Sequence, residues 1–160
     1  MKTVKKFARP LVAGALSAAV LPFVPGIAAA DDVPPPIVEE YDYPGADAIY
    51  AQYHIRLLKG DGHILFTDCT ASGPLVKVWS RIAERSYFCF RITGESGYLT
   101  MDVPDVFAIT GDAHELKATV VIKGTATPTD VVKNTYTPVG EGADPQNGFT
   151  PLVELRSGRS

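Results

Sequence analysis

The sequence predicts a mainly β protein, an antiparallel β-sandwich or barrel with one short N-terminal helix and one disulfide bond. Short apolar segments whose side chains alternate with a period of two recur between residues 55 and 155. Turns rich in Gly, Pro and Asp separate these segments. Only residues 47–53 show the spacing of an amphipathic helix. Many short strands with little helix are typical of sandwiches and barrels.

The first 30 residues have the order of a secretory signal peptide. Residues 1–9 carry four positive charges and no negative charge, and residues 11–24 are largely apolar. Ala28 and Ala30 then supply the small side chains that signal peptidase requires. The apolar stretch is shorter than the roughly 20 residues of a membrane span and is broken by proline. We therefore expect cleavage after Ala30 and a secreted, extracellular protein without membrane attachment.

Composition divides the remaining chain into a leader, a domain and a tail. Residues 31–46 form an acidic, Pro-rich leader, because three consecutive prolines hold the chain extended and cannot enter a sheet interior. Residues 47–156 have the length and the strand pattern of a single β domain. Residues 157–160 remain as a C-terminal tail.

The charge balance excludes two classes of partner. Removal of residues 1–30 leaves 11 of the 15 basic residues and all 18 acidic residues, which gives a net charge of −7. Nucleic acids and anionic membranes attract proteins with a positive field, so we expect neither as a partner. The mature protein is expected to be a monomer.

The helix is predicted first along the chain. Pro44-Gly45 provides the preceding turn, and Asp47 is a suitable N-cap. Ile49 and Tyr53 then fall on one face at the i, i+4 spacing. The helix is expected to be about two turns long.

The strands follow the helix. Residues 59–62 combine Gly and Asp and are expected to form a hairpin turn between the first two strands. Residues 94–97 are expected to form a second hairpin turn, and residues 124–128 a further turn. The predicted strands are 55–58, 64–69, 75–79, 87–92, 98–103, 106–109, 116–123, 129–133, 135–139 and 152–155.

Cys69 and Cys89 are the only cysteines, and we expect them to form a disulfide. Pairing is the usual state of two cysteines in an oxidising compartment. A free catalytic thiol would be oxidised outside the cell. A zinc site is disfavoured because the paired C-x-x-C spacing is missing.

The strand pattern also gives a candidate ligand contact. Trp79 shares a strand face with Lys77, while Val76 and Val78 share the opposite face. If the valines face the core, Trp79 lies outside and becomes a candidate contact residue. The neighbouring strand adds two further candidates, Tyr87 and Arg91. The alternative is that Trp79 packs against the disulfide, as is common in sandwich domains.

Evidence for catalysis or metal binding is weaker. Four carboxylates, from Asp102, Asp105, Asp112 and Glu115, lie close together in the sequence and are a possible calcium site. They lack the alternating pattern of calcium loops, and Asp at strand ends also serves turns. The histidines are too widely spaced for a zinc motif, and residues 94–98 miss the final Gly of a serine-hydrolase elbow. No catalytic residue or cofactor is identified.

Several segments carry a resemblance to a known group of proteins. The segments 60–65, 89–94, 97–99 and 134–142, together with Cys69, are similar to small secreted proteins of high-GC Gram-positive bacteria. The resemblance extends from about residue 43 to residue 156. It implies export and no particular activity, and it transfers no functional residue.

Three hypotheses about function follow. The first is a secreted, non-catalytic β-sandwich module that binds an extracellular protein, peptide or cell-wall glycan. The second is a small secreted hydrolase or metal-assisted enzyme that uses His63 or the four carboxylates. The third is a secreted protease inhibitor that presents residues 70–74 beside the disulfide.

Overall fold

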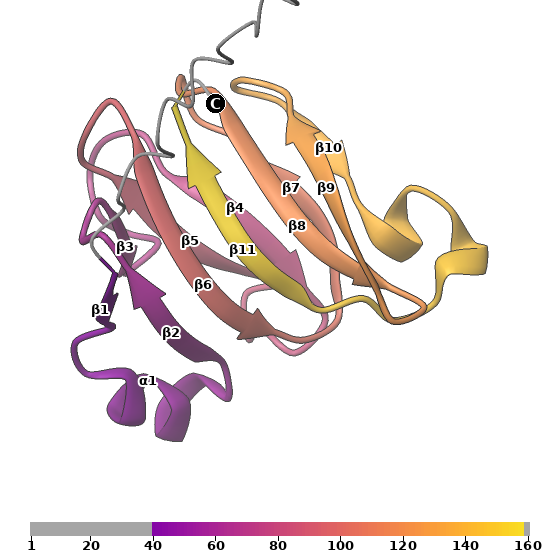
Figure 1. Cartoon of the computed structure of the whole chain (residues 1–160), viewed down its shortest axis with the longest axis horizontal. Coiled ribbons are helices and arrows are strands. Elements are labelled where there is room, and N and C mark those ends of the chain that lie inside the picture. Colours follow the sequence, from indigo (N-terminus) through magenta and orange to yellow (C-terminus); the bar gives the residue numbers. More distant parts are fainter. Residues whose placement is uncertain (1–39, 159–160) are drawn as a thin grey trace, which may run out of the picture. The chain divides into compact units, whose positions relative to one another are not determined.

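The computed structural model describes residues 40–158, which form two antiparallel sheets and one helix (Figure 1). The expected signal peptide, most of the expected leader and residues 159–160 lie outside the described residues. Along the chain the elements are β1 (Tyr41–Asp42), α1 (Ala46–Tyr53), β2 (Arg56–Gly60), β3 (Ile64–Thr67), β4 (Val76–Ser80), β5 (Tyr87–Ile92), β6 (Gly97–Val103), β7 (Val106–Thr110), β8 (Leu116–Ile122), β9 (Thr125–Val131), β10 (Tyr136–Pro138), the 3-10 helices η1 (Gly140–Gly142) and η2 (Pro145–Asn147), and β11 (Leu152–Ser157).

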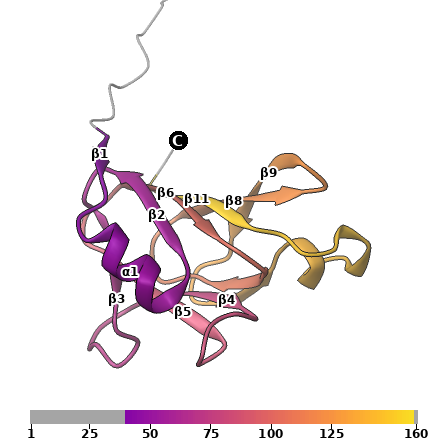
Figure 2. The same ribbon diagram turned by 90° about the horizontal axis from the view of Figure 1, so that it is seen from below.

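The two sheets make an open sandwich, which confirms the predicted fold class and decides against a barrel. Sheet A has the strand order β1-β2-β6-β11-β8-β9, and sheet B has the order β10-β7-β4-β5-β3. In Figure 1 the strands β6, β11 and β8 of sheet A lie in front of β4 and β7 of sheet B. Helix α1 lies beside β2 (Figure 2). Between residues 40 and 158, no helix has the length and apolar character needed to cross a bilayer.

The core lies between the sheets and follows the predicted alternation. Val76 and Val78 of β4 and Phe90 of β5 are fully buried. They belong to one apolar cluster with Leu99 of β6 and Leu155 of β11. Because successive side chains of a strand point to opposite faces, this cluster fixes which residues of sheet B face outward.

The N-cap of helix α1 lies two residues earlier than the sequence predicts. Its N-cap is Gly45, which adopts a left-handed conformation with φ of 72°, and no side chain caps the helix. Asp47 lies inside the first turn, where a negative charge is favourable near the helix N-terminus. The prediction of Asp47 as N-cap is therefore wrong, because glycine can reach a backbone conformation that is costly for other residues.

Two turns that were predicted to be hairpins connect different sheets, so both hairpin predictions are wrong. Strand β2 pairs with β6 in sheet A, whereas β3 pairs with β5 in sheet B, so residues 59–62 connect the sheets. Residues 94–97 do the same between β5 and β6. A Gly- and Asp-rich turn reverses the chain direction in either case, and the sequence does not specify which strand the chain meets next.

The third predicted turn is shorter than expected. Lys123 and Gly124 both have positive φ, at 49° and 82°, and form a tight two-residue turn between β8 and β9. Strand β9 therefore starts at Thr125 and continues through Pro128. Proline is tolerated there because β9 is the outermost strand of sheet A.

The last part of the expected leader joins sheet A. Tyr41 and Asp42 form β1 and pair with Gly60 and Lys59 of β2. The next residue, Tyr43, contacts the other sheet, where its hydroxyl accepts a 2.7 Å hydrogen bond from the amide of Phe66 in β3. Residues 41–43 thus join the two sheets at one side of the sandwich.

The Tyr43 contact predicts a loss of stability in alkali. Burial raises the pKa of the Tyr43 phenol above its usual value, and the hydrogen bond from Phe66 partly offsets this effect. Burial and the carboxylates of Glu154 and Glu40 also raise the pKa of Tyr98. A raised folded-state pKa stabilises the fold below the unfolded pKa of about 10, and that stability is lost as the pH rises through the folded value.

Urea unfolding at about pH 8 and about pH 11 checks this expectation. The midpoint of the wild-type protein should fall at the higher pH. The Tyr43→Phe variant should lose less between the two conditions, because only Tyr98 still contributes. An identical fall in both proteins would contradict a role for Tyr43.

Candidate functional site

The outer face of sheet B carries a cluster of aromatic side chains. Trp79 of β4 is paired with Tyr87 of β5 on one side and with Ala108 of β7 on the other. Since Val78 and Phe88 point into the core, Trp79 and Tyr87 point away from it. Tyr136, from β10, joins them from the outermost strand of the sheet.

Tyr136, Trp79 and Tyr87 form a continuous row across four strands, which we call the aromatic row. The ring centroids of Trp79 and Tyr87 are 4.8 Å apart, and those of Trp79 and Tyr136 are 5.7 Å apart. The ring planes are inclined by 57° and 67°, so the rings pack against each other without stacking in parallel. Tyr136 is 47% exposed, and Trp79 and Tyr87 are partly exposed.

Trp79 is held in one orientation by its neighbours. Its indole Nε1–H donates a 2.9 Å hydrogen bond to the Thr110 hydroxyl of β7, and a tyrosine contacts the ring on each side. Lys77, not Trp79, lies directly opposite Cys89 of the disulfide on the neighbouring strand. The aromatic side chains that contact the Trp79 ring are Tyr87 and Tyr136. A side chain fixed before binding loses little conformational entropy when a ligand arrives.

Tyr136 has no sequence feature that marks it as a site residue. It lies in a short, mostly exposed strand at the border of sheet B. Its place beside Trp79 results from pairing between β10 and β7, and residues 136 and 79 are far apart in the chain. Such long-range pairing leaves no local signature in a single sequence.

Two cations accompany the aromatic row. The Lys77 ammonium lies 5.0 Å from the centroid of the Tyr87 ring, at the distance of a cation–π contact. Arg91, also on the outer face of β5, donates from Nη2 to the Ser72 carbonyl at 2.7 Å. None of the ion pairs found within residues 40–158 involves Lys77 or Arg91.

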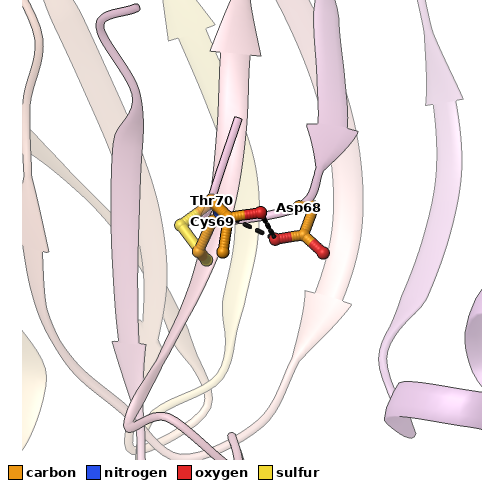
Figure 3. The surroundings of a disulfide bond; sticks show 4 residues. Asp68, Cys69 and Thr70 are labelled. Carbon is orange, nitrogen blue, oxygen red and sulfur yellow. Dashed lines mark hydrogen bonds between the residues drawn. A yellow bond between two sulfur atoms is a disulfide. The ribbon is translucent and has the colours of Figure 1, made fainter. Parts of the chain in front are cut away.

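The predicted disulfide is present and anchors the loop that follows β3. Cys69 and Cys89 are bonded, with their Cα atoms 5.2 Å apart (Figure 3). The Asp68 carboxylate accepts hydrogen bonds from the Thr70 amide and hydroxyl at 2.7 and 2.8 Å. These two bonds, with a smaller contribution from Arg85, hold the pKa of Asp68 below its usual value.

Residues 68–71 form a hydrogen-bonded turn that overlaps the segment 70–74 proposed as an inhibitory loop. The Ala71 amide donates to the Asp68 carbonyl at 3.0 Å, which bends the chain immediately after the disulfide. The hydrogen bond from Arg91 then fixes Ser72 against β5.

A small cavity adjoins the aromatic row at Tyr87. Its volume is about 170 Å³, which is below the roughly 300–1,000 Å³ of pockets that enclose a drug-sized ligand. The cavity is therefore large enough for a small polar group and too small for a drug-sized ligand. Its lining includes the disulfide, the aromatic rings of Tyr53, Phe66 and Phe88, and the polar side chains of Gln52, Thr67, Asp68, Glu84 and Arg85.

The four candidate calcium ligands do not converge. Asp102 and Asp105 lie where β6 turns into β7, whereas Asp112 and Glu115 lie beyond the opposite end of β7. Within residues 40–158, no group of three or more His, Cys, Asp or Glu side chains is placed to hold a metal ion. Asp105 instead contacts Arg81 at 2.9 Å, and Glu115 contacts Lys133 at 3.5 Å.

Asp112 has a structural role that can be measured. Its side chain is almost fully buried and accepts hydrogen bonds from the His114 amide at 2.9 Å and from His114 Nδ1 at 2.8 Å. We expect Asp112→Ala to lower the free energy of unfolding by about 1–3 kcal/mol, because the partly buried amide of His114 loses its acceptor. His114→Gln keeps the hydrogen bond from the backbone amide of residue 114 to Asp112, so it should lower the free energy of unfolding by less. Equal losses for both variants in urea unfolding would contradict this explanation.

Comparison with protein-family models and with curated protein sequences finds no match to this chain.

Proposed function

We propose that the protein is an exported, non-catalytic binding module that holds an extracellular glycan on the outer face of sheet B. The observation that carries this proposal is the aromatic row, in which three adjoining rings are fixed on a solvent-facing sheet. Partly exposed aromatic side chains on a rigid scaffold supply contact area at a low cost in entropy. The disulfide and the signal-like N-terminus support export.

The packing of the rings favours a glycan over a peptide. Peptides in the polyproline conformation dock between separated aromatic side chains, whereas the Trp79 ring packs directly against the rings of Tyr87 and Tyr136. Peptides that add to a sheet need an unpaired strand, and β4 is paired on both sides. A sugar ring needs neither feature, because its C–H faces pack on aromatic faces, which carry partial negative charge.

Polar groups around the row suit a ligand with many hydroxyls. The phenol groups of Tyr87 and Tyr136 can donate and accept hydrogen bonds, and Lys77 adds further donors. A glycosidase would need two carboxylates facing its substrate. The five strands of sheet B contain no Asp or Glu, so they supply no such pair, and the carboxylates of Asp68 and Glu84 line only the small cavity beside Tyr87.

Affinity gel electrophoresis with a panel of soluble glycans, together with cosedimentation with isolated cell walls, tests the proposal. The wild-type protein should be retarded by at least one glycan and pelleted by walls, and Trp79→Ala should lose both properties. Binding that is unchanged by Trp79→Ala would contradict the proposed site.

Mass spectrometry of the native protein tests export separately. We expect a secreted species that begins at Asp31 and contains the Cys69–Cys89 disulfide. A cell-internal species that retains Met1 and has two alkylatable thiols would overturn this part of the proposal.

A further inference from the structure

We infer that the glycan is anionic, a chain of carboxylate-bearing sugars whose acidic groups meet Lys77 and Arg91 beside the aromatic row. This inference rests on the proposed function and names the class of ligand. It follows from how charge is distributed between the two sheets.

The strands of sheet B carry only positive formal charges. Lys77 and Arg91 are their charged residues, and no Asp or Glu occurs in any of the five strands. The whole chain, by contrast, has 18 acidic and 15 basic residues. The strands of sheet A reflect this balance, since they contain four acidic residues: Asp42, Asp102, Asp130 and Glu154. Strands that carry bases and no acids are complementary to a negatively charged ligand, and the carboxylates of Asp68 and Glu84 lie in the connecting loops at the cavity beside Tyr87.

Lys77 is available for such a ligand. Its cross-strand neighbours are Thr110 and Cys89, neither of which is charged, and its ammonium lies over the Tyr87 ring. Two other basic residues in the strands are arranged differently: Lys117 lies 3.6 Å from Asp130, and Arg156 lies 3.5 Å from Glu154. A carboxylate that approaches Lys77 therefore does not have to displace a protein carboxylate.

Arg91 extends the positive strip along β5. It lies two residues beyond Cys89, the residue opposite Lys77, and such diagonal neighbours on one face are roughly 7–8 Å apart. Its guanidinium donates one recorded hydrogen bond, to Ser72, and a guanidinium has five N–H donors. Arg91 can thus keep its place and still contact a ligand.

The expected result depends on how much the positive charges and the aromatic row each contribute to the binding free energy. Exposed ion pairs change affinity by only about twofold to fivefold each and weaken with salt. The charges therefore select an acidic glycan, while the aromatic row supplies the larger, salt-insensitive share of the binding.

The experiment compares polygalacturonate with its fully methyl-esterified form, which keeps the sugar chain and removes the charge. Poly-L-glutamate serves as an acidic polymer that is not a glycan. Each is titrated into wild-type protein, Lys77→Gln, Arg91→Gln and Trp79→Ala. Lys117→Gln is the matched control, because Lys117 lies in sheet A. Titrations are repeated between about 0.01 and 0.15 M ionic strength, over which the Debye length falls from roughly 30 to 8 Å.

We expect polygalacturonate to bind more tightly than its ester, and the difference to shrink as salt is added. Lys77→Gln and Arg91→Gln should each weaken polygalacturonate binding by about twofold to fivefold and leave binding of the ester unchanged. Lys117→Gln should have no effect on either. Poly-L-glutamate should bind more weakly than polygalacturonate.

The contrary outcomes separate this inference from the proposed function. If acid and ester bind equally and both depend on Trp79, the glycan module stands and the anionic ligand is wrong. If poly-L-glutamate binds as tightly as polygalacturonate, the face recognises charge and the ligand is not specified as a glycan. If none of the polymers binds through Trp79, the inference of an anionic glycan fails, and the glycan panel and cell-wall experiment decides the proposed function separately.

Discussion

Trp79→Ala is expected to weaken glycan binding by roughly 30-fold or more while the protein stays folded. Trp79 is the central member of the aromatic row, and it touches the ring of Tyr87 on one side and that of Tyr136 on the other. Truncation of a central aromatic anchor commonly costs about 2 kcal/mol or more of binding free energy, and each 1.4 kcal/mol is about tenfold in Kd. The variant removes the anchor and also frees both tyrosines to move.

The fold should tolerate this change because Trp79 lies outside the core. Its loss removes one hydrogen bond and two ring contacts, for about 1–3 kcal/mol of stability. Isothermal titration calorimetry measures the binding, and urea unfolding measures the stability. Trp79→Phe retains a ring without the Nε1 donor and should bind with intermediate affinity.

Tyr98→Ala provides the matched control for loss of an aromatic side chain. Tyr98 is a partly exposed residue of β6 in sheet A, where Arg156 lies 4.4 Å from its ring centroid. We expect this variant to bind like the wild-type protein. If Tyr98→Ala weakens binding as much as Trp79→Ala, the effect on Trp79 is not specific to the aromatic row.

Removal of the disulfide by a Cys69→Ala and Cys89→Ala double substitution is expected to lower the free energy of unfolding by about 3 kcal/mol. The bond closes a loop with a sequence separation of 20 residues, and the entropy of that loop in the unfolded chain sets the size of the effect. For a domain of this length the corresponding fall in Tm is roughly 10 °C. Alanine is preferred to serine because Cys89 is fully buried and a hydroxyl there would lack a partner.

Reduction of the wild-type protein is the control for the double substitution. Chemically reduced protein should melt close to the variant, because both lack the same crosslink. An oxidised wild-type protein that melts with the double variant would contradict the expected contribution. Glycan binding by the folded variant should persist, since the aromatic row is held by strand pairing and by Thr110.

Local features of the fold could be predicted from the sequence, and strand partnership could not. The alternation in 76–79 and 87–92 separated the two faces of each strand correctly, because burial of one strand face imposes a period of two. The turn residues 59–62 and 94–97 were recognised as chain reversals, yet each connects the two sheets. A turn motif specifies backbone angles over a few residues, whereas the neighbour of a strand depends on the packing of the whole domain.

In the candidate site, too, some residues could be predicted from the sequence and others could not. Trp79, Tyr87 and Arg91 are identifiable from the faces of two strands, and the structure places all three on the outer face of sheet B. Tyr136 could not be identified, because its proximity to Trp79 arises from the pairing of β10 with β7. The four carboxylates between 102 and 115 are close in sequence, but β7 runs between the two pairs and separates them.

The outermost strands of both sheets limit self-association of the protein. Sheet A ends in β1, which has two residues, and in β9, which contains Pro128; sheet B ends in β10, which contains Pro138, and in β3, whose Phe66 amide is bonded to Tyr43. Short strands, prolines and occupied amides are poor templates for a strand from another molecule. Copies concentrated on a polymeric ligand should therefore remain separate instead of joining through their sheets into aggregates or fibrils.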